Sequence, residues 1–261
     1  MITLQGTKQK EETLGLIALA WGRASVGEEI QIIQPNEMGG KSLEKLVLNH
    51  FPDAITDSRN KSRYITVIKQ ENEPDIILEW MANTRLRYVG QTGFYSMPGL
   101  FGWDKIDAGS RLLLDHLPDL KGVSCDFGCG YGYLSKNILL RNEKIKTLYC
   151  FDYDNRAIDA CKLNIDDARA VIRQADCTRP ISDVPPLDFI IMNPPFHDGN
   201  AEDKQLGVKF IEMAAHHLRN KGALWMVANR HLPYEPILTN RFTTVDKIIE
   251  KNGFKIFKAL K

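Results

Sequence analysis

An apolar strand in the second half of the chain runs into Asn193-Pro194-Pro195-Phe196, a segment suited to methyl-transfer chemistry. Proline fixes its backbone φ angle and has no N–H to donate, so carbonyl oxygens here are free to accept from a ligand. An exocyclic ring amine is a weak nucleophile because its lone pair is delocalised. Hydrogen bonds from its two N–H groups to Asn193 Oδ1 and the Pro194 carbonyl favour a pyramidal nitrogen whose lone pair faces an electrophilic methyl group. A rigid loop after a strand is the alternative interpretation.

The residues around this corner complete the expected substrate site. Phe196 is placed to stack on the acceptor ring, and Pro195 and His197 are expected to contact the substrate. Three roles stay open for His197: it accepts the released proton, it contacts the substrate, or its side chain only satisfies polar groups of its own loop. No base is needed before transfer, because the amine becomes acidic once it is methylated. We therefore expect Asn193, Pro194 and Phe196 to act by orientation and by stabilising the developing charge.

A glycine-rich turn follows an earlier apolar strand, where residues 128–132 read Gly-Cys-Gly-Tyr-Gly. The missing Cβ atoms of Gly128 and Gly130 allow a tight turn and let a ligand lie against the backbone. The spacing differs from the G-x-G-x-x-G of dinucleotide sites, which seat a pyrophosphate on a helix N-terminus. Asp126, at the strand end, is suited to accept from a cationic ammonium such as the methionine amine of S-adenosylmethionine. Alone, the loop is explained equally well by a tight strand–helix turn.

Two further acidic residues end the next two predicted strands. Asp152 is suited to accept from both ribose hydroxyls, as in dinucleotide sites. Asp176 is suited to accept from an adenine amino group. Taken alone, it is explained equally well as an ordinary aspartate of a turn. Three strand-end acids behind one glycine loop line the crevice where such sheets bind ligands. Together they predict a site for S-adenosylmethionine, with Asn193 at its border.

A regular alternation of strands and helices begins near residue 105 and must position these segments. Strands are expected at 123–127, 147–151, 171–175, 189–192 and 223–228, and helices at 105–117, 131–141, 154–166 and 204–219. Two last strands, 243–250 and 254–260, meet at an Asn-Gly turn and predict an antiparallel hairpin. We therefore expect an α/β fold with a Rossmann-like, mostly parallel seven-stranded sheet. The closing hairpin departs from the six-stranded dinucleotide fold and favours class I methyltransferases.

The first part of the chain predicts a smaller α/β unit. Helices are expected at 8–22 and 42–49, and strands at 29–34, 63–69 and 76–80. Glycine and proline breakers follow between residues 90 and 99. We therefore expect a small N-terminal domain over residues 1–90 and a catalytic domain over residues 91–261.

Composition limits the class of protein only broadly. The chain has 261 residues and a net charge of +1, which neither indicates nor excludes nucleic-acid binding because a local basic patch suffices. No apolar run approaches the roughly 18 residues needed to span a bilayer. The N-terminus also lacks the layout of a secretory signal, so we expect a cytoplasmic protein without a membrane partner. Five cysteines without metal-binding spacing predict reduced core thiols and no metal site.

With both motifs in place, the chain resembles class I methyltransferases acting on amino groups. Residues 193–199, Asn-Pro-Pro-Phe-His-Asp-Gly, look like the bacterial rRNA guanine-N2 methyltransferases of the RsmC/RlmG type, and residues 98–110 and 227–234 agree. The resemblance implies S-adenosylmethionine as cofactor and ribosomal RNA or a ribosomal subunit as partner. It also implies that Phe101 and Asp107 border the cofactor and that Arg230 borders the acceptor pocket. It further implies that the N-terminal half is a degenerate copy of the catalytic fold, shortened in this chain.

Other acceptors and functions stay open at this point. Adenine-N6 transfer to RNA or DNA uses the same amine geometry, and a small-molecule amine is compatible with the near-neutral charge. Phe196 disfavours protein-glutamine methyltransferases, which usually have Asn-Pro-Pro-Tyr. A non-catalytic RNA-binding assembly factor is disfavoured because Asp126, Asp152 and Asn193 are all present.

Overall fold

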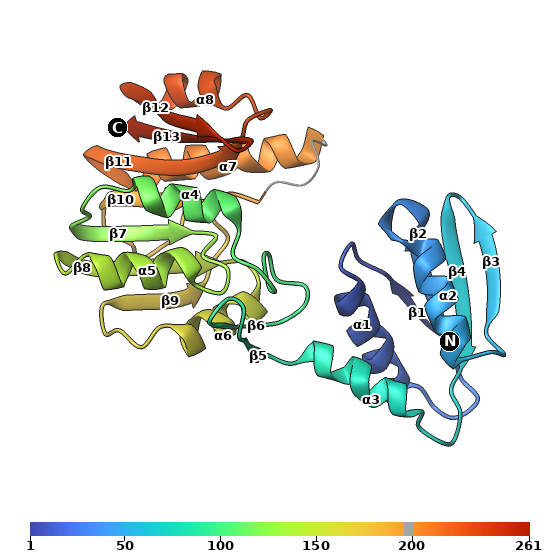
Figure 1. Ribbon diagram of the computed structural model, residues 1–261. Coiled ribbons are helices and arrows are strands. Elements are labelled where there is room, and N and C mark those ends of the chain that lie inside the picture. The colour runs from blue at the N-terminus through green and yellow to red at the C-terminus, as the bar shows by residue number, and fades with distance from the viewer. Residues whose placement is uncertain (196–200) are drawn as a thin grey trace. The chain divides into compact units, whose positions relative to one another are not determined.

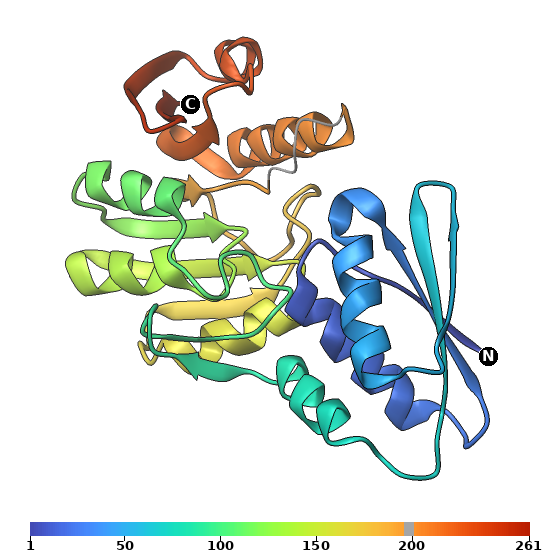
Figure 2. The same ribbon diagram turned by 45° about the vertical axis from the view of Figure 1, so that its right-hand side comes forward.

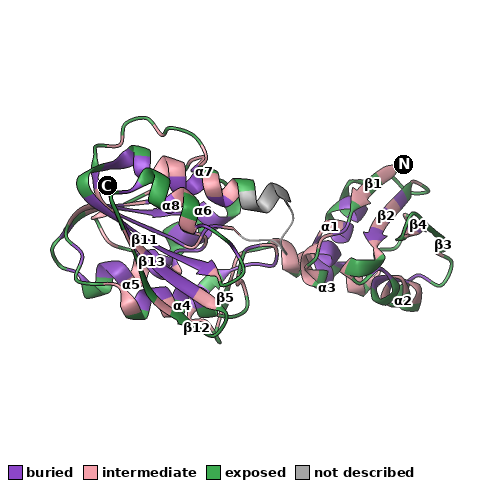
Figure 3. Cartoon of the chain, turned by 90° about the horizontal axis from the view of Figure 1, so that it is seen from above, coloured by how far each residue is buried: buried purple, intermediate pink, exposed green. Residues whose placement is uncertain are grey.

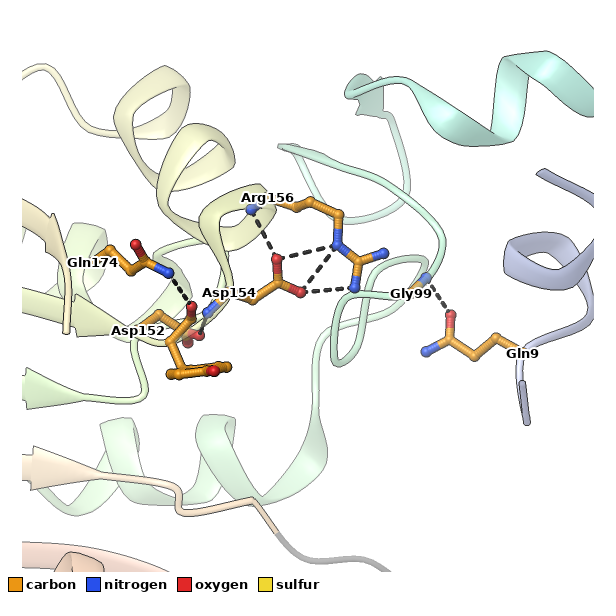
Figure 4. Close-up of polar contacts among 7 residues, drawn as sticks. Gln9, Gly99, Asp152, Asp154, Arg156 and Gln174 are labelled. Atoms are coloured by element: carbon orange, nitrogen blue, oxygen red, sulfur yellow. Dashed lines mark hydrogen bonds and ion pairs between the residues drawn. The ribbon is translucent and has the colours of Figure 1, made fainter. Parts of the chain in front are cut away.

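The computed structural model describes residues 1–195 and 201–261, the side chains of 201–204 excepted, and the chain forms two compact units (Figure 1). Unit 1 comprises Met1–Arg87 with Met97–Gly99, and unit 2 comprises Tyr88–Ser96 with Leu100–Lys261. The short return to unit 1 is held there by the Gly99 N–H, which donates to Gln9 Oε1 at 2.7 Å (Figure 4).

Unit 1 is a four-stranded sheet in the order β1-β2-β4-β3, with β1 parallel to β2 and the other pairs antiparallel. Its elements are β1 (Ile2–Gln5), α1 (Lys10–Arg23), β2 (Glu29–Pro35), the 3-10 helix η1 (Asn36–Met38), α2 (Gly40–His50), β3 (Ile55–Arg59), β4 (Ser62–Ile68), α3 (Asp75–Met81) and the 3-10 helix η2 (Ala82–Thr84). Alternate residues of the central strands, Ile30, Ile32, Ile65 and Val67, form one core with the helices.

The strand predicted at 76–80 is wrong, because this segment is the helix α3. Ile77 and Trp80, three residues apart, are buried on one face while Leu78 between them is exposed. Pro74 stands just before the helix and Asp75 in its first turn, where an acidic side chain is favoured by the helix dipole. A short apolar run does not distinguish a buried helix from a strand by its period, and packing against α1 decides the outcome.

Unit 2 confirms the expected mostly parallel seven-stranded sheet closed by an antiparallel hairpin. The strand order is β12-β13-β11-β10-β7-β8-β9; the pairs from β11 to β9 are parallel, and β13 is antiparallel to β11 and β12. The elements are β5 (Arg87–Val89), β6 (Phe94–Ser96), α4 (Ala108–His116), β7 (Gly122–Phe127), α5 (Tyr133–Arg141), β8 (Ile145–Asp152), α6 (Asn155–Asn164), β9 (Ala170–Gln174), β10 (Leu187–Met192), α7 (Ala201–His217), β11 (Leu218–Asn229), α8 (Glu235–Arg241), β12 (Thr244–Lys251) and β13 (Phe254–Leu260). The separate β5–β6 ribbon and α8 are additions that the sequence pattern did not predict.

Helices cover both faces of the large sheet (Figure 2). Helices α4, α5 and α6 pack against side chains such as Leu148 and Ile191 on one face. Helices α7 and α8 pack against Phe127, Ile190 and Met226 on the other. The central strands are therefore buried along most of their length (Figure 3). Since β7, β8, β9 and β10 are parallel, their carboxyl ends meet at one edge, which is where such sheets bind ligands.

Some features that could define other protein classes are not found in the described part of the chain. None of its helices combines the length and apolar composition required to cross a bilayer. Within residues 1–195 and 201–261, no group of three or more potential ligands is arranged to hold a metal ion. The five cysteines are unpaired and buried, as a small hydrophobic side chain commonly is.

Candidate active site

The register of β7 against β10 places the two sequence motifs next to each other. Phe127, the last residue of β7, is opposite Met192, the last residue of β10. Gly128 and Asn193 therefore leave adjacent parallel strands at the same edge of the sheet. The glycine loop and the Asn-Pro-Pro corner therefore lie next to each other at the edge where such sheets bind ligands.

The glycine loop is tied to the end of the neighbouring strand β8. The N–H groups of Gly128 and Cys129 both donate to the Phe151 carbonyl, at 2.8 and 2.9 Å. The Gly130 N–H donates to Asp152 Oδ2 at 2.9 Å. The loop is thus held by three hydrogen bonds with Gly128 at φ 74° and Gly130 at φ 55°, values that favour glycine.

The loop leaves room for a ligand beside its backbone. A Cβ atom built on Gly130 has nothing within 4 Å, and one on Gly128 meets only Phe210 at 3.6 Å. Gly132 differs, because a Cβ there would lie 2.9 Å from Cys161 Sγ. Gly130 therefore faces open space while Gly132 packs on helix α6. This cradle fits a cofactor that lies against the loop, as S-adenosylmethionine is expected to do.

Asp126 lies beneath the loop and is completely buried. Its Oδ2 accepts from Ser135 Oγ at 2.6 Å, and no described residue donates to its Oδ1. Burial raises the pKa of the carboxyl to about 7. In this conformation the side chain is closed to direct contact with a ligand, and a contact with an ammonium requires the loop above it to shift. An unpartnered buried carboxylate oxygen still favours a cation nearby.

The other two strand-end acids, Asp152 and Asp176, differ in how far they are engaged, and Figure 4 shows Asp152 at the end of β8. Asp152 Oδ1 accepts from the Asp154 N–H at 2.9 Å, and burial raises the pKa of Asp152. Asp152 remains partly exposed at the edge, beside the loop. Asp176 Oδ1 accepts from the N–H and hydroxyl of Thr178, which lowers the pKa of Asp176, and its Oδ2 lies 3.3 Å from Arg179. Asp176 is therefore largely committed to its own turn.

Asn193 is held by the first turn of α4. Its Nδ2 donates to Asp107 Oδ2 at 3.0 Å and to Ser110 Oγ at 2.9 Å. Among the described residues, none donates to Asn193 Oδ1, which is the oxygen an amine needs. Pro194 is buried and Pro195 half-buried, so the corner is anchored on the sheet.

The remaining predicted residues are distributed around this edge. Phe101 is 61% exposed, and Asp107 is the N-cap of α4 as well as a partner of Asn193. Arg230 directly follows β11, the neighbour of β10; its side chain is exposed and its N–H donates to the Gly253 carbonyl at 2.8 Å. Phe196 and His197 lie outside the described residues.

Two serines with direct roles in this network were missed by sequence reasoning. Ser110 contacts Asn193, and Ser135 contacts Asp126. Asp107 and Ser110 have the spacing of an aspartate N-cap that accepts from the N–H three residues on, and this was the available signal. Nothing in the local pattern around Ser135 distinguishes it from an ordinary first-turn serine.

Several known proteins are similar to this chain. Residues 91–258 match the family Methyltransferase small domain. The ribosomal RNA small subunit methyltransferase C of Vibrio parahaemolyticus is 33% identical over 264 residues, covering 100% of this chain and 77% of the relative. That of Shewanella denitrificans is 30% identical over 251 residues, covering 94% and 72%. A solved structure, the T. thermophilus 16S rRNA N2 G1207 methyltransferase (RsmC) in complex with AdoMet and guanosine, has a TM-score of 0.79 at 19% identity and covers 99% of this chain and 72% of that one.

Proposed function

The chain belongs to the methyltransferase small domain family, and we propose that it transfers the methyl group of S-adenosylmethionine to N2 of a guanine in small-subunit ribosomal RNA. The relatives are named for that RNA, and the T. thermophilus relative is named for guanine N2. In this proposal residues 91–261 are the catalytic domain, and the enzyme works in the cytoplasm, where bacterial ribosomes are assembled.

One observation supports this function most directly: Asn193 and Gly128 emerge side by side from paired strands, with Asn193 Oδ1 unengaged by described residues. When bound, S-adenosylmethionine supplies an electrophilic methyl group on its sulfonium. Asn193 Oδ1 and the Pro194 carbonyl accept from the two N–H groups of the guanine amine. This turns the nitrogen lone pair toward the cofactor side of the crevice, and orientation supplies most of the acceleration.

The cofactor is held on the glycine side. Asp152 accepts from the ribose hydroxyls with the lone pairs that Gly130 and Asp154 leave free. Asp126 lies buried under the loop with its Oδ1 unpartnered by the described residues, and we place the methionine ammonium on that side, where its positive charge favours the ionised carboxyl. We place Phe101 beside the cofactor, and Phe196, His197 and Arg230 beside the acceptor base. Asp176 holds its own turn, and we place that turn beside the adenine of the cofactor.

The modified nucleosides of a deletion strain test this function. Small-subunit ribosomal RNA is digested and scanned by mass spectrometry in wild type, deletion, and deletion complemented with wild type or Asn193→Ala. We expect N2-methylguanosine to fall in the deletion and to return with the wild-type gene alone. An unchanged N2-methylguanosine level with a fall in N6-methyladenosine would show that adenine is the acceptor. No change in any RNA nucleoside would point to a small-molecule amine.

A further inference from the structure

The amide of Asn193 is oriented by two residues of a different part of the chain. Both of its N–H groups are used, one by Asp107 Oδ2 at 3.0 Å and one by Ser110 Oγ at 2.9 Å. An asparagine side chain can rotate its amide by 180°, which exchanges the donor and the acceptor. Only one orientation presents Oδ1 to an amine.

The two acceptors are themselves fixed before any ligand binds. Asp107 Oδ2 also accepts from the Ser110 N–H at 2.7 Å, which caps α4. A Cβ atom on Gly109 would lie 2.9 Å from Phe254 Cε1, so the first turn of α4 packs tightly on β13. Leu113 and Leu114 continue that contact into the core. The first turn of α4 is therefore a rigid support for Asn193.

The two supporting side chains do different work. A serine hydroxyl donates or accepts, so Ser110 tolerates either orientation of the amide. An ionised carboxylate only accepts, so a rotated amide would place Asn193 Oδ1 against Asp107 Oδ2, two oxygens without a proton between them. Asp107 therefore decides that Nδ2 and not Oδ1 of Asn193 faces it, and Ser110 helps to fix the plane of the amide.

We propose that Asp107 and Ser110 are positioning residues that keep Asn193 Oδ1 turned toward the acceptor and so favour an acceptor that donates a hydrogen bond, as an amine N–H does. This assignment rests on the proposed function for its chemistry, but the hydrogen bonds it depends on exist without an acceptor. Asp107 is expected to border the cofactor, and this assignment gives it a second role through its hydrogen bond to the Asn193 amide.

A reciprocal exchange of the two side chains tests the role of Asp107. In Asn193→Asp two carboxyl groups meet and have to share a proton, so turnover falls further as pH rises and that proton is lost. In the double variant Asp107→Asn with Asn193→Asp, the amide introduced at position 107 donates to the carboxylate introduced at position 193. Because Asp107 Oδ2 also accepts from the Ser110 N–H, an amide nitrogen in its place gives up that cap, and the single variant Asp107→Asn measures this cost. We expect the double variant to turn over faster than Asn193→Asp at about pH 8 and to lose its pH dependence. Turnover at or below the product of the two single effects would overturn the assignment.

Nuclear magnetic resonance supplies a readout that needs no acceptor. The side-chain NH₂ signals of Asn193 are identified by their loss in Asn193→Ala. We expect these protons to exchange slowly with water in wild type and at least about tenfold faster in Ser110→Ala, since one acceptor is gone. Asp154→Asn, a substitution at the N-cap of α6 that does not contact Asn193, is the matched control and should leave the exchange unchanged. Equal exchange in wild type and Ser110→Ala overturns the role of Ser110.

Failure of the proposed function can be distinguished from failure of the positioning role. If wild type methylates adenine or a small amine, the rescue by the double variant is measured with that acceptor and is still expected. The exchange rates of the Asn193 NH₂ protons need no acceptor and are expected to be the same. If wild type makes N2-methylguanosine but neither readout responds, the positioning role fails alone.

Discussion

The backbone N–H of Gly130 donates to Asp152 Oδ2 at 2.9 Å, which joins the glycine loop after β7 to the acid that ends β8. The loop conformation and the position of the carboxylate therefore depend on each other. Gly130 faces open space, so the same hydrogen bond holds both walls of the cofactor cradle. Substitutions on either side of this bond should affect cofactor binding before they affect the fold.

We expect Asp152→Asn to weaken S-adenosylmethionine binding by about tenfold, because one strong charge-assisted acceptor for the ribose hydroxyls is lost. Calorimetric titration of the cofactor measures this. The matched control is Asp154→Asn, the same substitution two residues on, where the side chain caps α6 and pairs with Arg156. Equal affinity losses in the two variants would argue against a ribose contact at Asp152.

Gly130→Ala should mainly lower cofactor affinity, and Gly132→Ala should mainly lower Tm. Both residues have positive φ, so each variant carries backbone strain of about 1–2 kcal/mol. The new methyl group at Gly130 enters open space, so cofactor affinity should fall while Tm changes modestly. At Gly132 it meets Cys161 Sγ, so the larger effect should be a lower Tm. Thermal unfolding and titration together separate the two, and a larger Tm loss at Gly130 would contradict the open cradle.

Asn193→Ala should leave cofactor affinity near that of wild type and lower turnover by about 100-fold or more, because an interaction made mainly in the transition state is removed. Calorimetry and single-turnover methyl transfer measure the two quantities. Asn137→Ala is the control, since that asparagine on α5 bonds only to the Tyr133 carbonyl among the described residues. Equal loss of affinity and turnover in Asn193→Ala would remove Asn193 from the chemical step.

The buried carboxyl of Asp126 should make stability depend on pH. Its pKa is raised from 3.8 to about 7 in the folded protein, so between these values the folded state binds a proton that the unfolded state has lost. The free energy of unfolding therefore falls as pH rises through this window and levels off above it. We expect Tm to decline from about pH 5 to about pH 8, and Asp126→Asn to remove much of that decline. The exposed Asp159→Asn is the control and should keep it; identical profiles for Asp126→Asn and wild type would contradict the shift.

Much of the fold was predictable because its signals are local. The strand–helix alternation after residue 105 and the Asn-Gly hairpin turn depend on residues within one element or one turn. The segment at 76–80 was wrong for the corresponding reason. Four apolar residues and one glutamate suit a strand or a buried helix, and only the packing of Ile77 and Trp80 on α1 decides between them.

The sequence by itself determined the chemical inventory: a glycine turn, acids at strand ends and an asparagine before two prolines, each recognisable because its function depends on residue type and close spacing. Tertiary structure alone decided that Asn193 bonds to Asp107 and Ser110, residues 86 and 83 positions away. It also decided that Asp126 is closed off under the loop instead of lining it. Burial and long-range hydrogen bonds depend on how separate elements pack, and no short stretch of sequence contains that information.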